Sequence, residues 1–270
     1  MKSLHLTVPG AIWPKAKYAL AGSLAAARLA LYPAAEFGWL FDPNDIATLF
    51  RDEAGDMPVT AAGQKVALML DKSGNGNHAV QPDSAKQPTY QVDGANGYLD
   101  FVNTASPTVV NCMDIAVAHL AAPRALIMAL RMDGGSSTRK TLAQCYGVTT
   151  NPWHPLSIEV NATDHLDSAI LASGSPSDPD AWPFGADQVI SCRYDYGATN
   201  NVVLRRGGAD VATGTAAGGS DVATGCRLMA NRLEVNRVDG RLYGAAYVKS
   251  FSSAQAVAEV EDFFAGRLGI

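Results

Sequence analysis

Oxygen-bearing side chains occupy every second position in one part of the segment LMLDKSGNGNHAVQ, residues 68–81. They are Asp71, Ser73, Asn75 and Asn77. Alternate oxygens followed by a glycine, here Gly76, form the first half of many calcium-binding loops, because such oxygens converge on a hard cation. The spacing therefore makes Asp71, Ser73 and Asn75 candidate calcium ligands.

The same segment also fits a turn between two strands. A calcium loop between two helices closes with a carboxylate six residues after the glycine, and Pro82 stands at that position. In the turn interpretation, Asp71 and Asn75 bind backbone amides, and Gly74 and Gly76 adopt positive φ. We expect a structural turn first and keep calcium binding and direct glycan contact as alternatives.

Two tryptophans lie among prolines and polar residues in expected long loops. They belong to NPWHP (151–155) and DAWPF (180–184). Sugars stack on exposed aromatic rings, and loops on a rigid sandwich often carry binding residues. The candidate glycan-binding residues are therefore Asn151, Trp153, Asp178, Asp180 and Trp182. The alternative is that each tryptophan covers the core beneath its loop.

Glycosidase chemistry has little support in the sequence. A retaining glycosidase needs two carboxylates about 5–5.5 Å apart, which alternate residues of one strand can supply. In SIEVN (157–161) only Glu159 is acidic, because Asn161 stands where its partner would be. Glu259 and Glu261 have the spacing but lie in an expected helix. We assign no catalytic residue and keep a polysaccharide depolymerase, with Glu159 as its carboxylate, as the minor alternative.

The histidines and cysteines show no metal or redox pattern. The five histidines are scattered, and no metal-binding or nucleophile motif surrounds them. His165, between Asp164 and Asp167, could join a polar cluster, although a solvated loop is the favoured interpretation. The four cysteines are also far apart, so we expect free thiols that pack as small apolar groups.

The middle of the chain is composed of short strand-like runs between clusters of Gly, Pro, Asn, Asp and Ser. The predicted strands are Val66–Leu70, Tyr98–Val102, Ala125–Arg131, Thr141–Tyr146, Leu156–Val160, Gln188–Tyr194, Val202–Arg206, Cys226–Ala230 and Leu242–Val248. Such a series predicts a mostly β fold, a two-sheet antiparallel jelly-roll sandwich. Gly207 and Gly208 indicate a hairpin tip. We expect a mobile surface loop from there to residue 225.

The N-terminal residues 1–38 are expected to form an arm that precedes the sandwich of residues 39–270. Residues 16–32 are rich in alanine and end at Pro33, which predicts a helix. Arg28 interrupts this run, which is shorter than the roughly 20 apolar residues of a membrane-spanning helix. We therefore expect no membrane insertion, with a secretory signal peptide as an alternative.

The C-terminal segment 253–268 has the pattern of an amphipathic helix. Ser252 or Ser253 can cap its first turn. Its apolar face comprises Ala256, Val257, Val260, Phe263, Phe264 and Leu268. The acidic residues Glu259, Glu261 and Asp262 fall on other faces, where we expect them to be solvated. The helix should pack near the closing edge of the sandwich.

The charge of the chain argues against a nucleic-acid partner. Net charge is −5, charged residues make up 17% of the chain, and no block of basic residues is present. A surface that follows nucleic-acid phosphates needs such a block.

Several segments together resemble a known family. Residues 39–81 begin with an aromatic residue before FDP and contain the D-x-SGNGN turn. Residues 86–101, KQPTYQVDGANGYLDF, and the end EDFFAGRLGI at 261–270 continue the pattern, the latter with shifted spacing. They resemble the laminin-G-like, concanavalin A-like jelly-roll domains of tailed-bacteriophage and prophage structural proteins. The resemblance covers residues 39–270.

This resemblance implies a non-enzymatic virion protein of the tail, baseplate or head surface, made in the host cytoplasm. It would meet other virion proteins, form a homo-oligomer, and bind a host cell-surface glycan through its loops. The arm 1–38 would dock either on its own sandwich or on a neighbouring subunit. The alternative function is a carbohydrate-binding module that acts as a lectin. No cofactor is implied, apart from the calcium considered above.

Overall fold

A computed structural model describes most of the chain. The described residues are 32, 37–103, 110–119, 124–134, 138–147, 156–169, 176–195, 201–216, 223–248 and 253–270. The predicted N-terminal helix lies outside them, apart from Tyr32.

One sheet has eight strands in the order β15-β14-β13-β8-β17-β6-β5, with β1 also paired to β17. Its strands are β1 (Gly38–Phe41), β5 (Thr89–Asp93), β6 (Asn96–Phe101), β8 (Arg124–Met132), β13 (Asp187–Tyr194), β14 (Val202–Arg206), β15 (Ala209–Gly214) and β17 (Gly240–Val248). All of their pairings are antiparallel.

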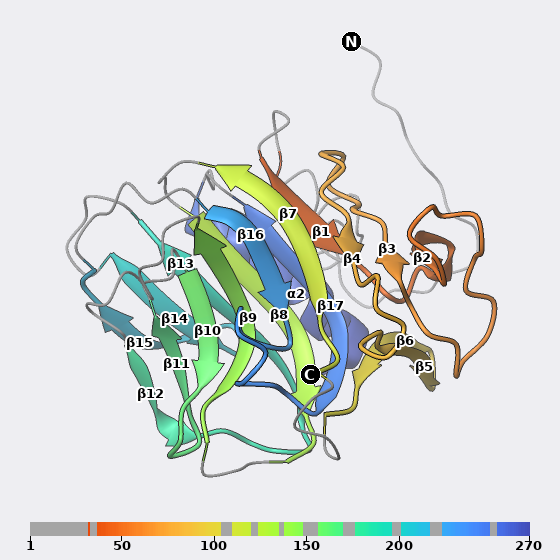
Figure 1. The fold of residues 1–270 in the computed structure, drawn as a ribbon. Coiled ribbons are helices and arrows are strands. Elements are labelled where there is room, and N and C mark those ends of the chain that lie inside the picture. The colour runs from red at the N-terminus through yellow and green to blue at the C-terminus, as the bar shows by residue number, and fades with distance from the viewer. Residues whose placement is uncertain are drawn as a thin grey trace, which may run out of the picture.

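The other sheet has nine strands in the order β12-β11-β10-β9-β16-β7-β4-β3-β2. They are β2 (Leu49–Phe50), β3 (Leu68–Met69), β4 (Ala79–Val80), β7 (Met113–His119), β9 (Lys140–Gly147), β10 (Leu156–Val160), β11 (His165–Ala169), β12 (Ser177–Ala181) and β16 (Ala223–Leu228). A short 3-10 helix, η1 (Ile46–Thr48), precedes β2. The two sheets lie face to face (Figure 1).

The predicted fold class is confirmed, since two antiparallel sheets form a sandwich followed by a C-terminal helix. Every predicted strand overlaps an observed one. The prediction of a loop after Gly207 and Gly208 is wrong for residues 209–214, because these residues form β15, which pairs with β14 and completes a hairpin. Both glycines form the tip of this hairpin, as predicted, and both have positive φ. The sequence of β15, ADVATG, lacks large apolar residues because the strand lies at the sheet edge and is largely exposed.

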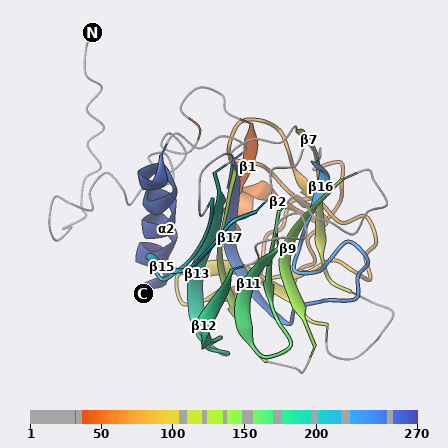
Figure 2. The same ribbon diagram turned by 90° about the vertical axis from the view of Figure 1, so that its left-hand side faces the viewer.

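The C-terminal helix α2 (Ala254–Leu268) begins and ends as its sequence predicts. The Ser253 hydroxyl accepts a hydrogen bond from the Ala256 amide, and Gly269 adopts the left-handed conformation that ends the helix. The helix lies across the outer face of the eight-stranded sheet, over β8 and β13, rather than near an edge of the sandwich. Figure 2 shows it on the side of this sheet away from β9.

The expectation that Glu261 is solvated is wrong. Glu261 is 2% exposed because its carboxylate turns toward the sheet. It accepts hydrogen bonds from Arg205 Nε at 3.0 and 3.1 Å and from the Ser191 hydroxyl at 2.5 Å. The buried carboxylate therefore links α2 to β13 and β14 through charge-assisted bonds.

Tyr32 belongs to the predicted arm, yet it packs on the sandwich of its own chain. It is buried with Leu40, Val248 and Val257. Its hydroxyl lies 2.5 Å from the Trp39 carbonyl oxygen and 2.6 Å from that of Tyr247. Both carbonyls belong to the paired strands β1 and β17.

We expect Tyr32→Phe to lower the free energy of unfolding by about 1–2 kcal/mol, because the hydroxyl hydrogen bond to these buried carbonyls is lost. Urea denaturation measures this change. Tyr90→Phe is the matched control, since its buried ring carries a hydroxyl without a hydrogen bond among the described residues, and its effect should stay within about 0.5 kcal/mol. Equal effects of the two variants would contradict the anchoring role of Tyr32.

The four cysteines are free and buried, as predicted. Burial raises the pKa of Cys112 and of Cys192 from 9.0 to about 12. Above about pH 9 the unfolded chain releases these protons while the folded protein keeps them, so stability falls with rising pH.

We therefore expect the free energy of unfolding to fall above about pH 9, by up to about 1.4 kcal/mol per pH unit for each of these thiols until about pH 12. Urea denaturation of the reduced protein at increasing pH measures the slope. In Cys192→Ala the free energy of unfolding should fall less steeply with pH, by the contribution of one thiol. An unchanged slope would show that other groups cause the loss of stability.

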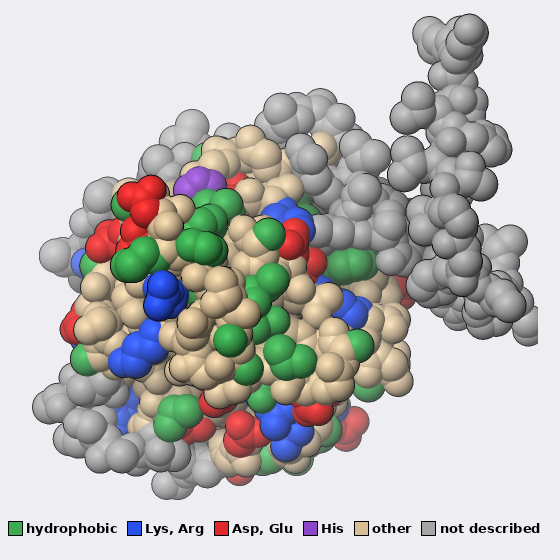
Figure 3. All heavy atoms as spheres, turned by 90° about the vertical axis from the view of Figure 1, so that its right-hand side faces the viewer, with side chains coloured by type: hydrophobic (Ala, Val, Ile, Leu, Met, Phe, Trp, Pro, Cys, Tyr) green, Lys and Arg blue, Asp and Glu red, His purple; other side chains and the backbone are tan. Residues whose placement is uncertain are grey.

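The described surface is mixed in charge. On the face seen in Figure 3, basic and acidic side chains alternate with apolar and polar ones and form no continuous basic strip. Among the described residues, no helix has the length and apolar character needed to cross a membrane.

Candidate functional site

The outer faces of the two sheets differ. Helix α2 packs against apolar side chains on the eight-stranded sheet, including Ala125, Ile127 and Val189. On the nine-stranded sheet, outward side chains in β7, β16 and β9 are polar or small, while inward ones such as Ile115 and Leu228 join the core. This alternation is typical of a sheet face without a covering layer, which is a surface open to a ligand.

Two registered rows cross this face. Arg227 of β16 stands opposite Asp114 of β7 and Gln144 of β9. Two residues along the same strands, Gly225 stands opposite Ala116 and Tyr146. The first row is therefore charged and polar, and the second combines two small residues with an aromatic ring.

The ring of Tyr146 lies over Gly225. A Cβ atom on Gly225 would come within 2.4–2.6 Å of the phenol end of this ring, so only glycine leaves room for it. The guanidinium carbon of Arg232 lies 5.8 Å from the ring centroid, within the range of a cation–π interaction. Tyr146 remains partly exposed, and Arg232 and Ala116 beside it are exposed. Burial raises the pKa of Tyr146 to about 12, so its hydroxyl is a donor at neutral pH.

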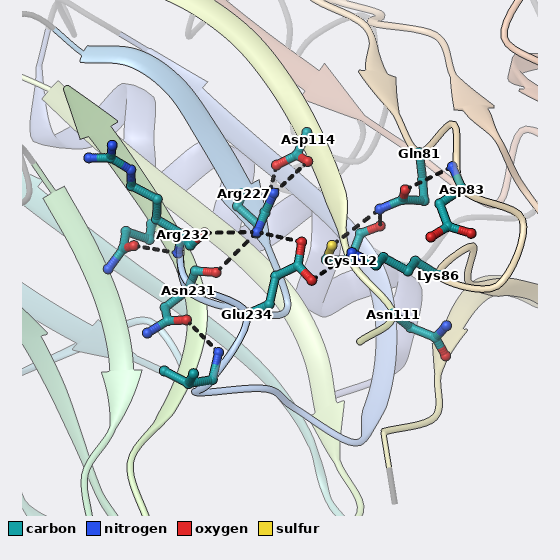
Figure 4. A network of polar contacts seen from close by, with 12 residues as sticks. Gln81, Asp83, Lys86, Asn111, Cys112, Asp114, Arg227, Asn231, Arg232 and Glu234 are labelled. Atoms are coloured by element: carbon teal, nitrogen blue, oxygen red, sulfur yellow. Dashed lines mark hydrogen bonds and ion pairs between the residues drawn. The ribbon is translucent and has the colours of Figure 1, made fainter. Parts of the chain in front are cut away.

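Arg227 is the centre of an ion-pair network (Figure 4). Its Nε and Nη2 donate to the two oxygens of Asp114 at 2.7 and 2.8 Å, and its Nη1 lies 3.2 Å from Glu234. The same Nη1 donates to the Arg232 carbonyl at 3.0 Å. Lys86 reaches the other oxygen of Glu234 at 2.7 Å. Burial lowers the pKa of Arg227, but the hydrogen bonds to Asp114 and the nearby negative charges outweigh this and raise it.

This network fixes the loop that follows β16. Glu234 has a φ of 60°, which costs a residue with a side chain about 1–2 kcal/mol. The two cations bound by its carboxylate offset that cost, and the Asn231 side chain accepts a bond from the Val235 amide at 2.9 Å. As a result, Leu233 and Val235 point outward and are 74% and 65% exposed.

The candidate calcium loop folds as a turn, and Asp71 binds backbone amides in it as predicted, whereas the Asn75 side chain donates to a carbonyl and to the Ser73 hydroxyl. Asp71 accepts hydrogen bonds from the amides of Leu40, Ser73 and Asn77 at 2.8–3.0 Å and from the Ser73 hydroxyl at 2.8 Å. Asn75 and Asn77 donate to the Gly38 carbonyl at 3.2 and 2.8 Å. Gly74 and Gly76 have positive φ. The loop thus holds β1, and calcium binding by Asp71, Ser73 and Asn75 stays a prediction.

Only one of the two tryptophan loops lies in the described structure. Trp182 is 3% exposed and belongs to the core, which agrees with the core-covering alternative. It follows β12, whose Ala181 pairs with His165. Residues 151–155, with Asn151 and Trp153, lie outside the described residues. They join β9 to β10 at the other end of these strands, where Cys145 pairs with Leu156.

Asp178 and Asp180 stand beside Arg206 rather than beside an aromatic platform. Asp178 is buried, and its carboxylate lies 3.0 Å from Arg206, while the exposed Asp180 lies 3.8 Å away. His165 Nδ1 contacts the Asp178 carbonyl at 2.9 Å, so it belongs to the β11–β12 hairpin rather than to a solvated loop. A glycan-binding role of Asp178, Asp180 and Trp182 stays a prediction.

Glu159 has a carboxylate neighbour that the sequence did not reveal. Asp167 of β11 stands directly opposite Glu159 of β10. However, Glu159 is 4% exposed, and its oxygens bind Arg139 at 2.5 Å and the Thr141 hydroxyl at 3.3 Å. Asn161 donates to Asp167 at 3.0 Å. Ion pairing and hydrogen bonds therefore hold both carboxylates within the sheet. In the described parts of the chain, no group of three His, Cys, Asp or Glu side chains could hold a metal ion.

Sequence reasoning missed Tyr146, Gly225 and the Arg227 network. The sequence places Tyr146 at the end of a predicted strand, and the predicted strand Cys226–Ala230 begins only after Gly225. A glycine beside a strand pattern can mark a close approach of another group, and this signal was available. The pairing of Arg227 with Asp114 and Glu234 could not be predicted from a local pattern, because it depends on the register of β16 with β7 and on the fold of the loop after β16.

No protein-family model and no curated protein matches the chain. Solved structures do share its fold. A Trypanosoma rangeli sialidase bound to a difluorinated nononic acid aligns with 87% of this chain and 33% of its own, at 7% identity and a TM-score of 0.54. The receptor binding domain of botulinum neurotoxin type G aligns with 74% of this chain and 48% of its own, at 10% identity and a TM-score of 0.52.

These similarities show the fold alone. The chain spans about a third of the sialidase and about half of the neurotoxin structure. They agree with the concanavalin A-like jelly roll that the sequence resemblance implies, and neither structure is a phage protein. Function must therefore be argued from the residues on this fold.

A double-mutant cycle of Asp114→Asn and Arg227→Met should give a coupling energy of about 1–3 kcal/mol, because the pair is bidentate and partly buried. Urea denaturation of the four proteins measures it. The matched control is Asp93→Asn with Arg241→Met, a 2.6 Å pair whose carboxylate is 62% exposed, which should give less than about 1 kcal/mol. Similar values for both pairs would contradict the central position of Arg227.

Proposed function

We propose that this protein is a non-catalytic glycan-binding β-sandwich and that the sugar binds to the outer face of the nine-stranded sheet. The observation that carries the proposal is the ring of Tyr146, which lies over Gly225 on a face that α2 does not cover. A sugar ring can pack its C–H face on an aromatic ring while its hydroxyls bind polar groups at the edge.

The polar groups beside the ring suit such a ligand. Arg232 is exposed and can donate to sugar oxygens, and the Tyr146 hydroxyl keeps its proton. Arg227, Asp114 and Glu234 are bound to one another, so they hold the surface in place at little further entropic cost on binding. Exposed Leu233 and Val235 add apolar surface on the neighbouring loop.

Binding is favoured over hydrolysis because the carboxylates are engaged. Glu159 is paired with Arg139, and Asn161 occupies the alternate position on its strand. A retaining or inverting glycosidase needs two carboxyl groups that face the scissile bond. The cross-strand neighbour Asp167 keeps the depolymerase as the minor alternative.

The setting of this binding is proposed from the sequence resemblance. The segments 39–81 and 86–101 support a virion component of a tailed phage or prophage, at the tail, baseplate or head surface. In that setting the protein would form a homo-oligomer, contact other virion proteins and bind a host cell-surface glycan. Tyr32 supports docking of the end of the arm on its own sandwich.

Binding to extracted host-surface glycans, measured by calorimetry, tests the proposal. Tyr146→Ala should weaken binding at least about tenfold, or about 1.4 kcal/mol, and Tyr146→Phe should keep most of it. Gly225→Ala should also weaken binding, because the new Cβ displaces the ring. Arg232→Ala should weaken binding, because it removes a donor beside the ring, and Arg51→Ala, at an exposed arginine in another part of the chain, is its control.

No binding by the folded protein, or binding that Tyr146→Ala leaves intact, would refute this site. Chelator in the same titration tests calcium at Asp71, Ser73 and Asn75, since binding lost in chelator would support that prediction. Release of reducing sugar, abolished by Glu159→Gln or Asp167→Asn, would replace the binding function with the depolymerase.

A further inference from the structure

Arg124 lies in the interior at one end of the sandwich. It begins β8 and stands opposite Tyr194, the last residue of β13. Its neighbour Ala125 faces α2, while Leu126 belongs to the core between the sheets. Because side chains alternate along a strand, Arg124 points inward with Leu126. It is 1% exposed.

The guanidinium of Arg124 has no hydrogen-bond partner in the part of the chain that the structure describes. Its Nε, Nη1 and Nη2 atoms are all buried, and none of them has a hydrogen-bond partner among the described residues. No carboxylate among the described residues lies within ion-pair distance of it. An arginine remains charged in proteins, and burial of an unpaired charge is strongly unfavourable. Some group must therefore compensate this charge.

The surroundings compensate it only in part. The guanidinium carbon lies 5.3 Å from the centroid of the Tyr194 ring, a cation–π contact. Burial raises the pKa of Tyr247 well above its usual value, and the charge of Arg124 opposes this shift, so the two groups are close. Cys192 is affected in the same way. Rings and thiols do not replace the hydrogen bonds that a guanidinium loses with its water.

The chain offers few acidic groups near this end. The segments that join strands here are 120–123, 148–155, 170–175, 196–200, 217–222 and 249–252, and among them only Asp221 is acidic. Before β1 there is Glu36, and after β13 there is Asp195, which is exposed. An external anion is therefore the simplest partner for Arg124.

We infer that Arg124 binds the carboxylate group of an acidic ligand at this end of the sandwich, between the two sheets. A planar guanidinium matches a carboxylate in bidentate geometry. A single unpaired cation also suits a monoanion, whereas a phosphate dianion would leave one charge uncompensated. This site is separate from the face around Tyr146 and does not depend on the proposed glycan binding.

Thermal unfolding with added anions tests this inference. In sodium chloride at constant ionic strength, replacement of part of the chloride by acetate should raise the midpoint of the native protein progressively, because the ligand binds the folded state. Arg124→Met should abolish the shift and should unfold no earlier than the native protein in chloride, since an apolar side chain removes the unpaired charge. Arg124→Lys keeps the charge but loses the planar guanidinium that binds a carboxylate through two parallel hydrogen bonds. Acetate should therefore raise the unfolding midpoint of this variant less than that of the native protein.

Glucuronate and glucose distinguish the possible sources of the carboxylate. Equal shifts with acetate and glucuronate would support a site for small acids, and a shift with glucuronate alone would support a site for acidic sugars. A shift with glucose as large as with glucuronate would overturn the inference.

Two further outcomes would also overturn it. One is an equal acetate shift in the native protein and Arg124→Met. The other is an internal ion pair, in which case Arg124→Met and either Asp221→Asn or Glu36→Gln would all unfold at a lower temperature than the native protein in chloride. Failure of glycan binding at Tyr146 would leave the anion shift unchanged, so the two proposals can fail separately.

Discussion

Burial of both faces of the eight-stranded sheet is the constraint on which the remaining architecture depends. Because the core covers one face of β8 and β17 and α2 covers much of the other, both strands are apolar almost throughout, as in ALIMAL and LYGAAYV. The helix in turn needs its buried Glu261 bound to Arg205 and Ser191. The eight-stranded sheet therefore contributes stability through burial of both of its faces. The polar outward side chains are concentrated on the nine-stranded sheet, where outward polar and inward apolar residues alternate along β7, β9 and β16.

In several places of this fold a carboxylate fixes the local conformation, either by accepting hydrogen bonds from backbone amides or by pairing with cationic side chains. Asp71 gathers the amides of Leu40, Ser73 and Asn77 and so fixes β1 against the loop after β3. Glu234 holds an unfavourable backbone conformation through Lys86 and Arg227. In each case burial strengthens the interaction and makes an unpaired partner costly. Arg124 differs from these groups because it has no hydrogen-bond partner among the described residues, and for this reason we infer a ligand for it.

Much of the fold could be predicted from the sequence. The strands from Leu156 to Val160 and from Val202 to Arg206 were predicted to the residue, because their composition and flanking turns are local signals. Eight of the described strands were missed, namely β1, β2, β4, β5, β7, β11, β12 and β15. The strands β2 and β4 have only two residues each, and β12 and β15 are largely exposed, so their pairing depends on neighbours rather than on their own residues. The candidate site was largely not predictable, because Tyr146, Gly225 and Ala116 meet only through the register of three strands.

The sequence by itself determined the fold class, the capped C-terminal helix, the free buried thiols and the turn at Asp71 to Asn77. These follow from periodicity, turn residues and composition, which act over a few neighbouring positions. Only the tertiary structure decided which sheet face is covered, that Glu261 is buried, that Glu159 faces Asp167 and that Arg124 lacks a hydrogen-bond partner among the described residues. Each of these depends on contacts between segments far apart in the chain, and a local pattern contains no information about which distant charge or ring will stand opposite it.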